Sequence, residues 1–133
     1  MKAMISTSMS VLIALFGAGQ FAAAAQPTSR EVNIAVHEVF VPEVVDKNTD
    51  AKIVLSGMFP NSCYRWSRVE VTSREATFHQ IKAMAFVTVN TMCLMVLVPF
   101  SKEVNLGQLD SGEHTLRFVS GDETYFEKKL IVR

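Results

Sequence analysis

The feature that most constrains the fold of this chain is a two-residue alternation of apolar and polar side chains in short segments. Val32, Ile34 and Val36 alternate with polar or small residues, and residues 81–89 follow the same period. Successive side chains of a β-strand point to opposite faces, so this period is typical of half-buried strands. Turn-forming clusters such as residues 110–112 separate the segments. The pattern predicts an all-β fold.

The number and spacing of these segments favour a β-sandwich. Roughly seven to eight short strands without a convincing helix are typical of that architecture. Residues 80–86 include helix-favouring side chains, but the alternation favours a strand there. The continuously apolar residues 93–98 predict a strand covered on both sides, and we expect them to form the central core element. Residues 57–62 predict an ordered loop.

The N-terminus has the features of a cleavable secretory signal peptide. Lys2 supplies a positive charge, residues 11–16 form a short apolar core, and residues 23–25 form an A-x-A cleavage site. A membrane anchor is the less favoured alternative, because Gly17 and Gln20 interrupt the apolar run well before the ~20 residues that a span requires. We expect export to the periplasm or the outside medium.

The remaining chain is long enough for one domain only. We expect a signal peptide in residues 1–25, a flexible leader in residues 26–30 and a single β-sandwich domain in residues 31–133. Without Lys2, the chain has 12 basic and 13 acidic residues. This balance gives no electrostatic argument for binding nucleic acid or an anionic membrane surface.

The two cysteines predict a structural disulfide. Cys63 and Cys93 both lie in the part that follows the signal, and paired thiols oxidise in extracytoplasmic compartments. A bridge between them closes a loop of about 30 residues. A redox-active pair would normally have C-x-x-C spacing, which these residues lack.

Several segments resemble a group of small secreted bacterial proteins that have an immunoglobulin-like β-sandwich and mostly no assigned function. Residues 57–64 are similar to their G-x-x-P-x-x-C-Y pattern, and Cys93 is followed by Val98-Pro99-Phe100. Residues 106–116 resemble the L-G-x-L-x-x-G-x-Y-x-[VL] corner of such sandwiches, with His114 in place of the usual tyrosine. The resemblance implies the fold, export and the disulfide, and it implies no chemistry.

Catalytic motifs do not stand out. The sequence has no G-x-S-x-G elbow for an activated serine. His37-Glu38 begins like a zinc-protease motif, but Val41 stands where the second histidine is needed. We therefore expect a protein that is not an enzyme and that uses no cofactor.

A metal site is the second hypothesis. His79, Met84, Met92 and Met95 are close in sequence, and imidazole and thioether ligands suit Cu(I). Methionine in a β core is more often a gap filler, and residues three apart on a strand face opposite sides. A copper or small-ligand carrier using His79, Met84 and Met95 is the alternative to a binding module.

Aromatic, methionine and arginine side chains gather in one part of the sequence, and such residues dominate binding hot spots. Trp66 could equally be the core residue of the sandwich, and Phe59 could cover the end of the core. Loops fixed on a sandwich often carry recognition. We predict an exported, non-catalytic interaction module of the bacterial cell envelope that binds another envelope or extracellular protein; a protease inhibitor is a further alternative. The candidate contact residues are Met58, Phe59, Tyr64, Arg65, Trp66 and Arg68.

Overall fold

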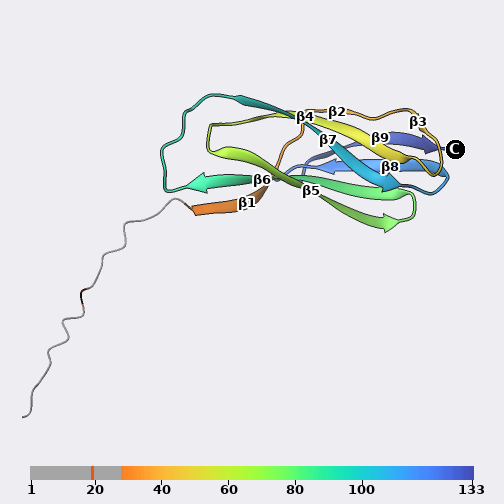
Figure 1. Ribbon diagram of the computed structural model, residues 1–133, viewed down its shortest axis with the longest axis horizontal. Helices are drawn as coiled ribbons and strands as arrows, with labels where there is room; N and C mark the ends of the chain where they lie inside the picture. Colours follow the sequence, from red (N-terminus) through yellow and green to blue (C-terminus); the bar gives the residue numbers. More distant parts are fainter. Residues whose placement is uncertain (1–18, 20–27) are drawn as a thin grey trace, which may run out of the picture.

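A computed structural model describes residue 19 and residues 28–133 of the chain (Figure 1). The predicted signal peptide and its cleavage site lie outside these residues, apart from Gly19. The described part is built from strands. They are β1 (Thr28–Ile34), β2 (Glu38–Phe40), β3 (Val44–Val45), β4 (Asp50–Phe59), β5 (Tyr64–Glu75), β6 (Phe78–Val89), β7 (Val98–Gln108), β8 (Gly112–Val119) and β9 (Tyr125–Val132).

The nine strands form two sheets. In the larger sheet β6 is central, with β5 antiparallel along one side. Along its other side, residues 78–81 of β6 pair with β8 in parallel, and residues 83–89 pair with β1 in antiparallel orientation. The sheet continues beyond β8 with β9 and then β3. The smaller sheet has the order β2-β4-β7. The molecule in Figure 1 is elongated along the strands, and the β6–β7 loop and the C-terminus lie at opposite ends.

The core lies between the two sheets and follows the alternation in the sequence. Ile53 and Leu55 of β4 and Ile81 of β6 are at most 1% exposed. Phe59 of β4 and Phe100 of β7 stack with ring centroids 4.6 Å apart, and Trp66 of β5 lies 5.7 Å from the Phe100 ring. Burial of these aliphatic and aromatic side chains is the main favourable contribution to folding.

The predicted fold class is confirmed. The described residues form an all-β sandwich, with nine strands where the sequence indicated seven to eight. Residues 80–86 lie within β6, so the helix alternative there is wrong. Residues 28–30, assigned to the flexible leader, instead pair with residues 87–89 of β6. A polar edge strand needs only backbone pairing, so the side-chain pattern did not reveal it.

The largest error concerns residues 93–98. The sequence predicted a central strand, but residues 93–97 form an irregular exposed segment and β7 begins only at Val98. An apolar run indicates burial only if the fold provides a covering layer, and none of the described residues covers this segment. Residues 57–59, predicted as a loop, belong to β4.

The predicted disulfide is confirmed. Cys63 and Cys93 are bonded, with their Cα atoms 5.4 Å apart. The bridge joins the β4–β5 connection to the β6–β7 loop at one end of the sandwich. In the part of the chain that the structure describes, no helix has the length and hydropathy of a membrane span.

Candidate functional site

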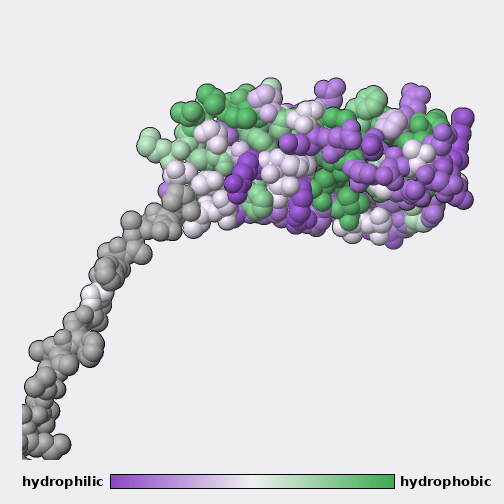
Figure 2. All heavy atoms as spheres, in the orientation of Figure 1, coloured by the Kyte–Doolittle hydropathy of each residue, from purple (hydrophilic) through white to green (hydrophobic). Residues whose placement is uncertain are grey.

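Six large apolar side chains are exposed together around the disulfide, and we call this set the apolar tip. Five of them, in the β6–β7 loop, are between 54% and 97% exposed, and the sixth, at the end of β4, is 46% exposed. Figure 2 shows apolar surface gathered at this end of the molecule. The residues of the apolar tip are Met58, Met92, Leu94, Met95, Val96 and Leu97.

The backbone around the tip is held in place although its side chains are exposed. Asn90 has a φ of 60°, in the left-handed region that asparagine adopts more readily than most residues, and it turns the chain away from β6. Ser62 and Leu94 are joined twice: the Ser62 amide donates to the Leu94 carbonyl at 3.0 Å, and the Leu94 amide donates to Ser62 Oγ at 2.7 Å. Together with the disulfide, these bonds fix one loop against the other.

The two segments that build the tip contain no charged side chain. No lysine, arginine, aspartate or glutamate occurs between Lys52 and Arg65, or between Lys82 and Lys102. Exposed edge strands are usually protected by charges, and β5 carries several. The apolar tip has no such protection from its own segments. Contiguous exposed apolar surface of this kind marks a site of interaction.

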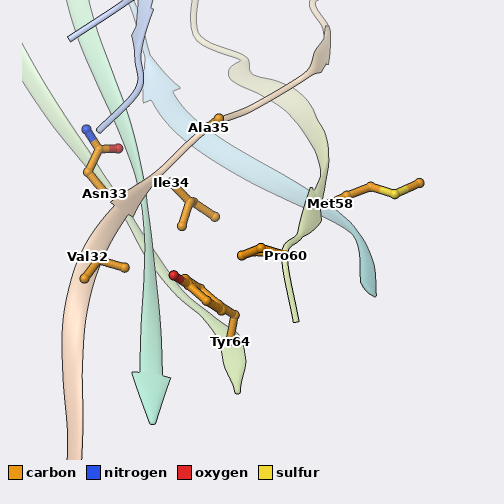
Figure 3. Close-up of a pocket in the computed structure, with 7 residues that line it drawn as sticks. All are labelled: Val32, Asn33, Ile34, Ala35, Met58, Pro60 and Tyr64. Carbon is orange, nitrogen blue, oxygen red and sulfur yellow. The ribbon is translucent and has the colours of Figure 1, made fainter. Parts of the chain in front are cut away.

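A pocket lies beside the tip, between the two sheets (Figure 3). It has a volume of about 310 Å³. The Tyr64 hydroxyl points across it toward Val32 in Figure 3. Met58 belongs to both the pocket and the tip, so the two features are continuous. The lining residues are Val32, Asn33, Ile34, Ala35, Met58, Pro60 and Tyr64.

The predicted contact residues divide into two groups. Phe59 is 4% exposed, so its candidacy as a surface contact is wrong; it covers the end of the core, which was the alternative. Trp66 packs partly buried against the core, as its alternative interpretation held. Tyr64 is half-buried and lines the pocket, while Met58 belongs to the tip.

The two arginines make their contacts within the larger sheet. The Arg65 guanidinium lies 5.1 Å from the centre of the Phe86 ring. Arg68 donates to Glu31 at 2.7 Å, and Ser67 Oγ donates to the same carboxylate at 2.6 Å. The hydrogen bond from Ser67, followed by that from Arg68, lowers the pKa of Glu31. Because the Arg68 side chain is 51% exposed, solvent screens this network, which ties β1 to β5 without contributing much to stability.

At the other end of β6, two histidines are buried together. His79 is 6% exposed and His114 is 0% exposed. Ser73 Oγ lies 2.7 Å from His79 Nδ1, His79 Nε2 lies 2.9 Å from His114 Nδ1, and His114 Nε2 lies 2.6 Å from the Asp110 carbonyl oxygen. Each ring nitrogen therefore has a partner.

The Asp110 carbonyl, at the end of this series of hydrogen bonds, fixes the direction of each of them when both imidazole rings are neutral. A carbonyl can only accept, so His114 Nε2 donates to Asp110 and His114 Nδ1 accepts. His79 Nε2 then donates to His114, and Ser73 donates to His79 Nδ1. Burial, followed by repulsion from His114, lowers the pKa of His79, which favours this neutral arrangement.

The bond from His114 to Asp110 also explains the substitution at the sandwich corner. The family resemblance implies a tyrosine whose hydroxyl bonds to upstream backbone, and His114 makes a comparable bond four residues upstream. Sequence reasoning missed the histidine pair. A signal was present, since His79 shares the inward register of Ile81 and His114 that of Leu116.

The residues of the metal hypothesis do not meet. His79 faces the core, whereas Met84 is an odd number of positions away on β6 and faces outward. Met95 lies in the loop beyond the other end of β6. Among the described residues there is no group of three or more histidine, cysteine, aspartate or glutamate side chains arranged to hold a metal ion.

These features define a β-sandwich domain with one disulfide and an apolar end. Residues 53–130 match the family model of the ORF11 beta-sandwich domain, and the chain belongs to that family. The match runs from within β4 to within β9, and so includes the disulfide, the tip and both buried histidines. None of the curated proteins compared matches the chain. None of the solved structures compared matches it either.

Proposed function

We propose that this chain is an exported, non-catalytic interaction module of the bacterial cell envelope that binds another protein through the apolar tip. The observation that carries the proposal is the exposure of Met92, Leu94 and Met95 at 71% or more beside a disulfide. Exposed apolar area gains free energy when a partner covers it, by about 25 cal/mol per Å². A braced loop also loses less conformational entropy on binding.

The backbone of the tip favours a protein partner over lipid. Among the described residues, no hydrogen bond reaches the backbone of residues 95–97. Unpaired amide and carbonyl groups are strongly disfavoured in the hydrocarbon of a bilayer. A polypeptide offers both apolar side chains and hydrogen-bonding groups, so it satisfies this loop better than acyl chains do. The absence of charge in both tip segments further favours an uncharged partner surface.

The proposal is tested by site-specific photo-crosslinking in the native envelope. A photoreactive phenylalanine at position 95 should crosslink to one identified protein. The same residue at position 131, where Ile131 is exposed at the other end of the molecule, should not. With the purified partner, Met95→Lys should weaken binding at least tenfold, while the matched control Ile131→Lys should leave it unchanged. Equal crosslinking at both positions, or unchanged affinity of Met95→Lys, would overturn the proposal.

A further inference from the structure

We infer that the pocket beside the tip receives one apolar side chain, aromatic or large aliphatic, from the bound partner. This inference rests on the proposed function and specifies how the partner is held. The occupant is a side chain of an uncharged polypeptide segment that lies over the tip, and the pocket is its anchoring point.

The volume of the pocket fits a single side chain. It measures about 310 Å³, whereas a cavity of about 150 Å³ accommodates benzene. The pocket is at the lower limit of the range for drug-sized ligands, about 300 to 1,000 Å³. One aromatic ring with its Cβ and adjoining backbone therefore fills the space.

The walls match such an occupant. Val32 and Ile34 of β1 and Pro60, which directly follows β4, supply apolar surface. Gly57 allows this close arrangement, because a Cβ there would lie 2.7 Å from the Phe100 ring and 3.2 Å from the Ala35 carbonyl oxygen. The chain crossing between the sheets at Ala35 can therefore lie close against β4 and form the wall of the pocket.

One polar group favours a peptide over a hydrocarbon in this pocket. The Tyr64 hydroxyl points across the pocket and can donate to a carbonyl oxygen of the occupant (Figure 3). The Asn33 side chain points to the opposite side of β1 and takes no part in this contact (Figure 3).

The first test uses a small probe and needs no partner. N-acetyl-phenylalanine methylamide should shift the NMR resonances of Val32, Ile34 and Tyr64 in a saturable manner, whereas N-acetyl-aspartate methylamide should not. Ala35→Phe should fill the pocket and abolish the shifts. Ala76→Phe, at an exposed alanine in the β5–β6 turn, is the matched control and should retain them. Absence of saturable shifts in the unaltered protein would overturn the inference.

The second test uses the purified partner and separates the two proposals. Ala35→Phe should weaken partner binding at least tenfold, and Tyr64→Phe should weaken it severalfold, with both variants folded by circular dichroism. If Met95→Lys weakens binding and Ala35→Phe does not, the tip binds the partner and the pocket inference is wrong. If Met95→Lys has no effect, the proposed function fails, and the probe titration alone then decides whether the pocket takes an apolar side chain.

Discussion

The two ends of β6 reverse the usual distribution of side chains in opposite ways. Near its start, the imidazole rings of His79 and His114 are buried. Beyond its end, the large apolar residues of the tip are exposed. Burial of a polar group is unfavourable unless it is hydrogen-bonded, and exposure of an apolar group is unfavourable unless something covers it.

Only one of these two unfavourable arrangements is compensated within the described residues. Four hydrogen-bonding positions on the two histidine rings have partners, so the buried end is complete. The tip has no covering layer from the described strands. This difference assigns a structural role to the histidine end, and it makes the disulfide end the expected binding surface for a partner.

The comparison is tested most strongly by two adjacent residues of β4. Phe59 points into the core and Met58 points outward at the tip. Phe59→Ala should lower the unfolding free energy by about 3 to 5 kcal/mol, because it leaves a cavity in the core. Met58→Ala should change it by less than about 0.5 kcal/mol. Urea denaturation measures both, and similar losses for the two variants would contradict the assignment of Met58 to the exposed tip.

Removal of the disulfide should have the next largest effect on the free energy of unfolding. Replacing both cysteines, in Cys63→Ser/Cys93→Ser, should lower the unfolding free energy by about 3 to 4 kcal/mol, since the loop between them is no longer closed in the unfolded chain. The two loops of the tip should also separate. The measurement is thermal denaturation together with partner binding; Ser111→Ala, at an exposed turn, is a control. Unchanged partner affinity in a folded double variant would show that the bridge does not organise the tip.

The sequence predicted the sandwich well because alternation records which face of a strand is buried. Residues 81–89 lie within β6, as their period indicated, and Cys63 and Cys93 are paired. These features depend on local pattern or on simple pairing of two thiols.

The candidate site was harder to predict, because exposure depends on which elements cover a segment. Residues 93–97 have the composition of a core strand, yet no described element packs over them. The pocket joins residues from β1, β4 and β5, which only the topology brings together. The contact between His79 and His114 likewise depends on the parallel pairing of β6 with β8, which the sequence did not indicate.

Substitutions of the two buried histidines should have coupled effects on the free energy of unfolding. His114→Leu leaves His79 Nε2 and the Asp110 carbonyl without their partner, so the unfolding free energy should fall by about 2 to 4 kcal/mol. His79→Leu should also destabilise, and the double variant should lose less than the sum of the two, with a coupling of about 1 to 2 kcal/mol. His37→Leu, at an exposed histidine, should have little effect. Additive losses in the double variant would mean that the two rings do not act as one network.

The smallest effect concerns pH and also originates at the histidine end. The pKa of His79 is lowered from its ordinary value of 6.5 by burial and by the neighbouring His114. Between the folded-state pKa of His79 and its ordinary value of 6.5, the unfolded chain binds a proton that the folded chain does not. The contribution of the neutral ring to stability is therefore full above pH 6.5 and is lost as the pH falls through the folded-state pKa. His79→Gln, which retains hydrogen-bonding groups, should flatten this dependence between pH 7.5 and 5. Chemical denaturation at several pH values measures it, and identical slopes for the two proteins would assign the acid sensitivity to other groups.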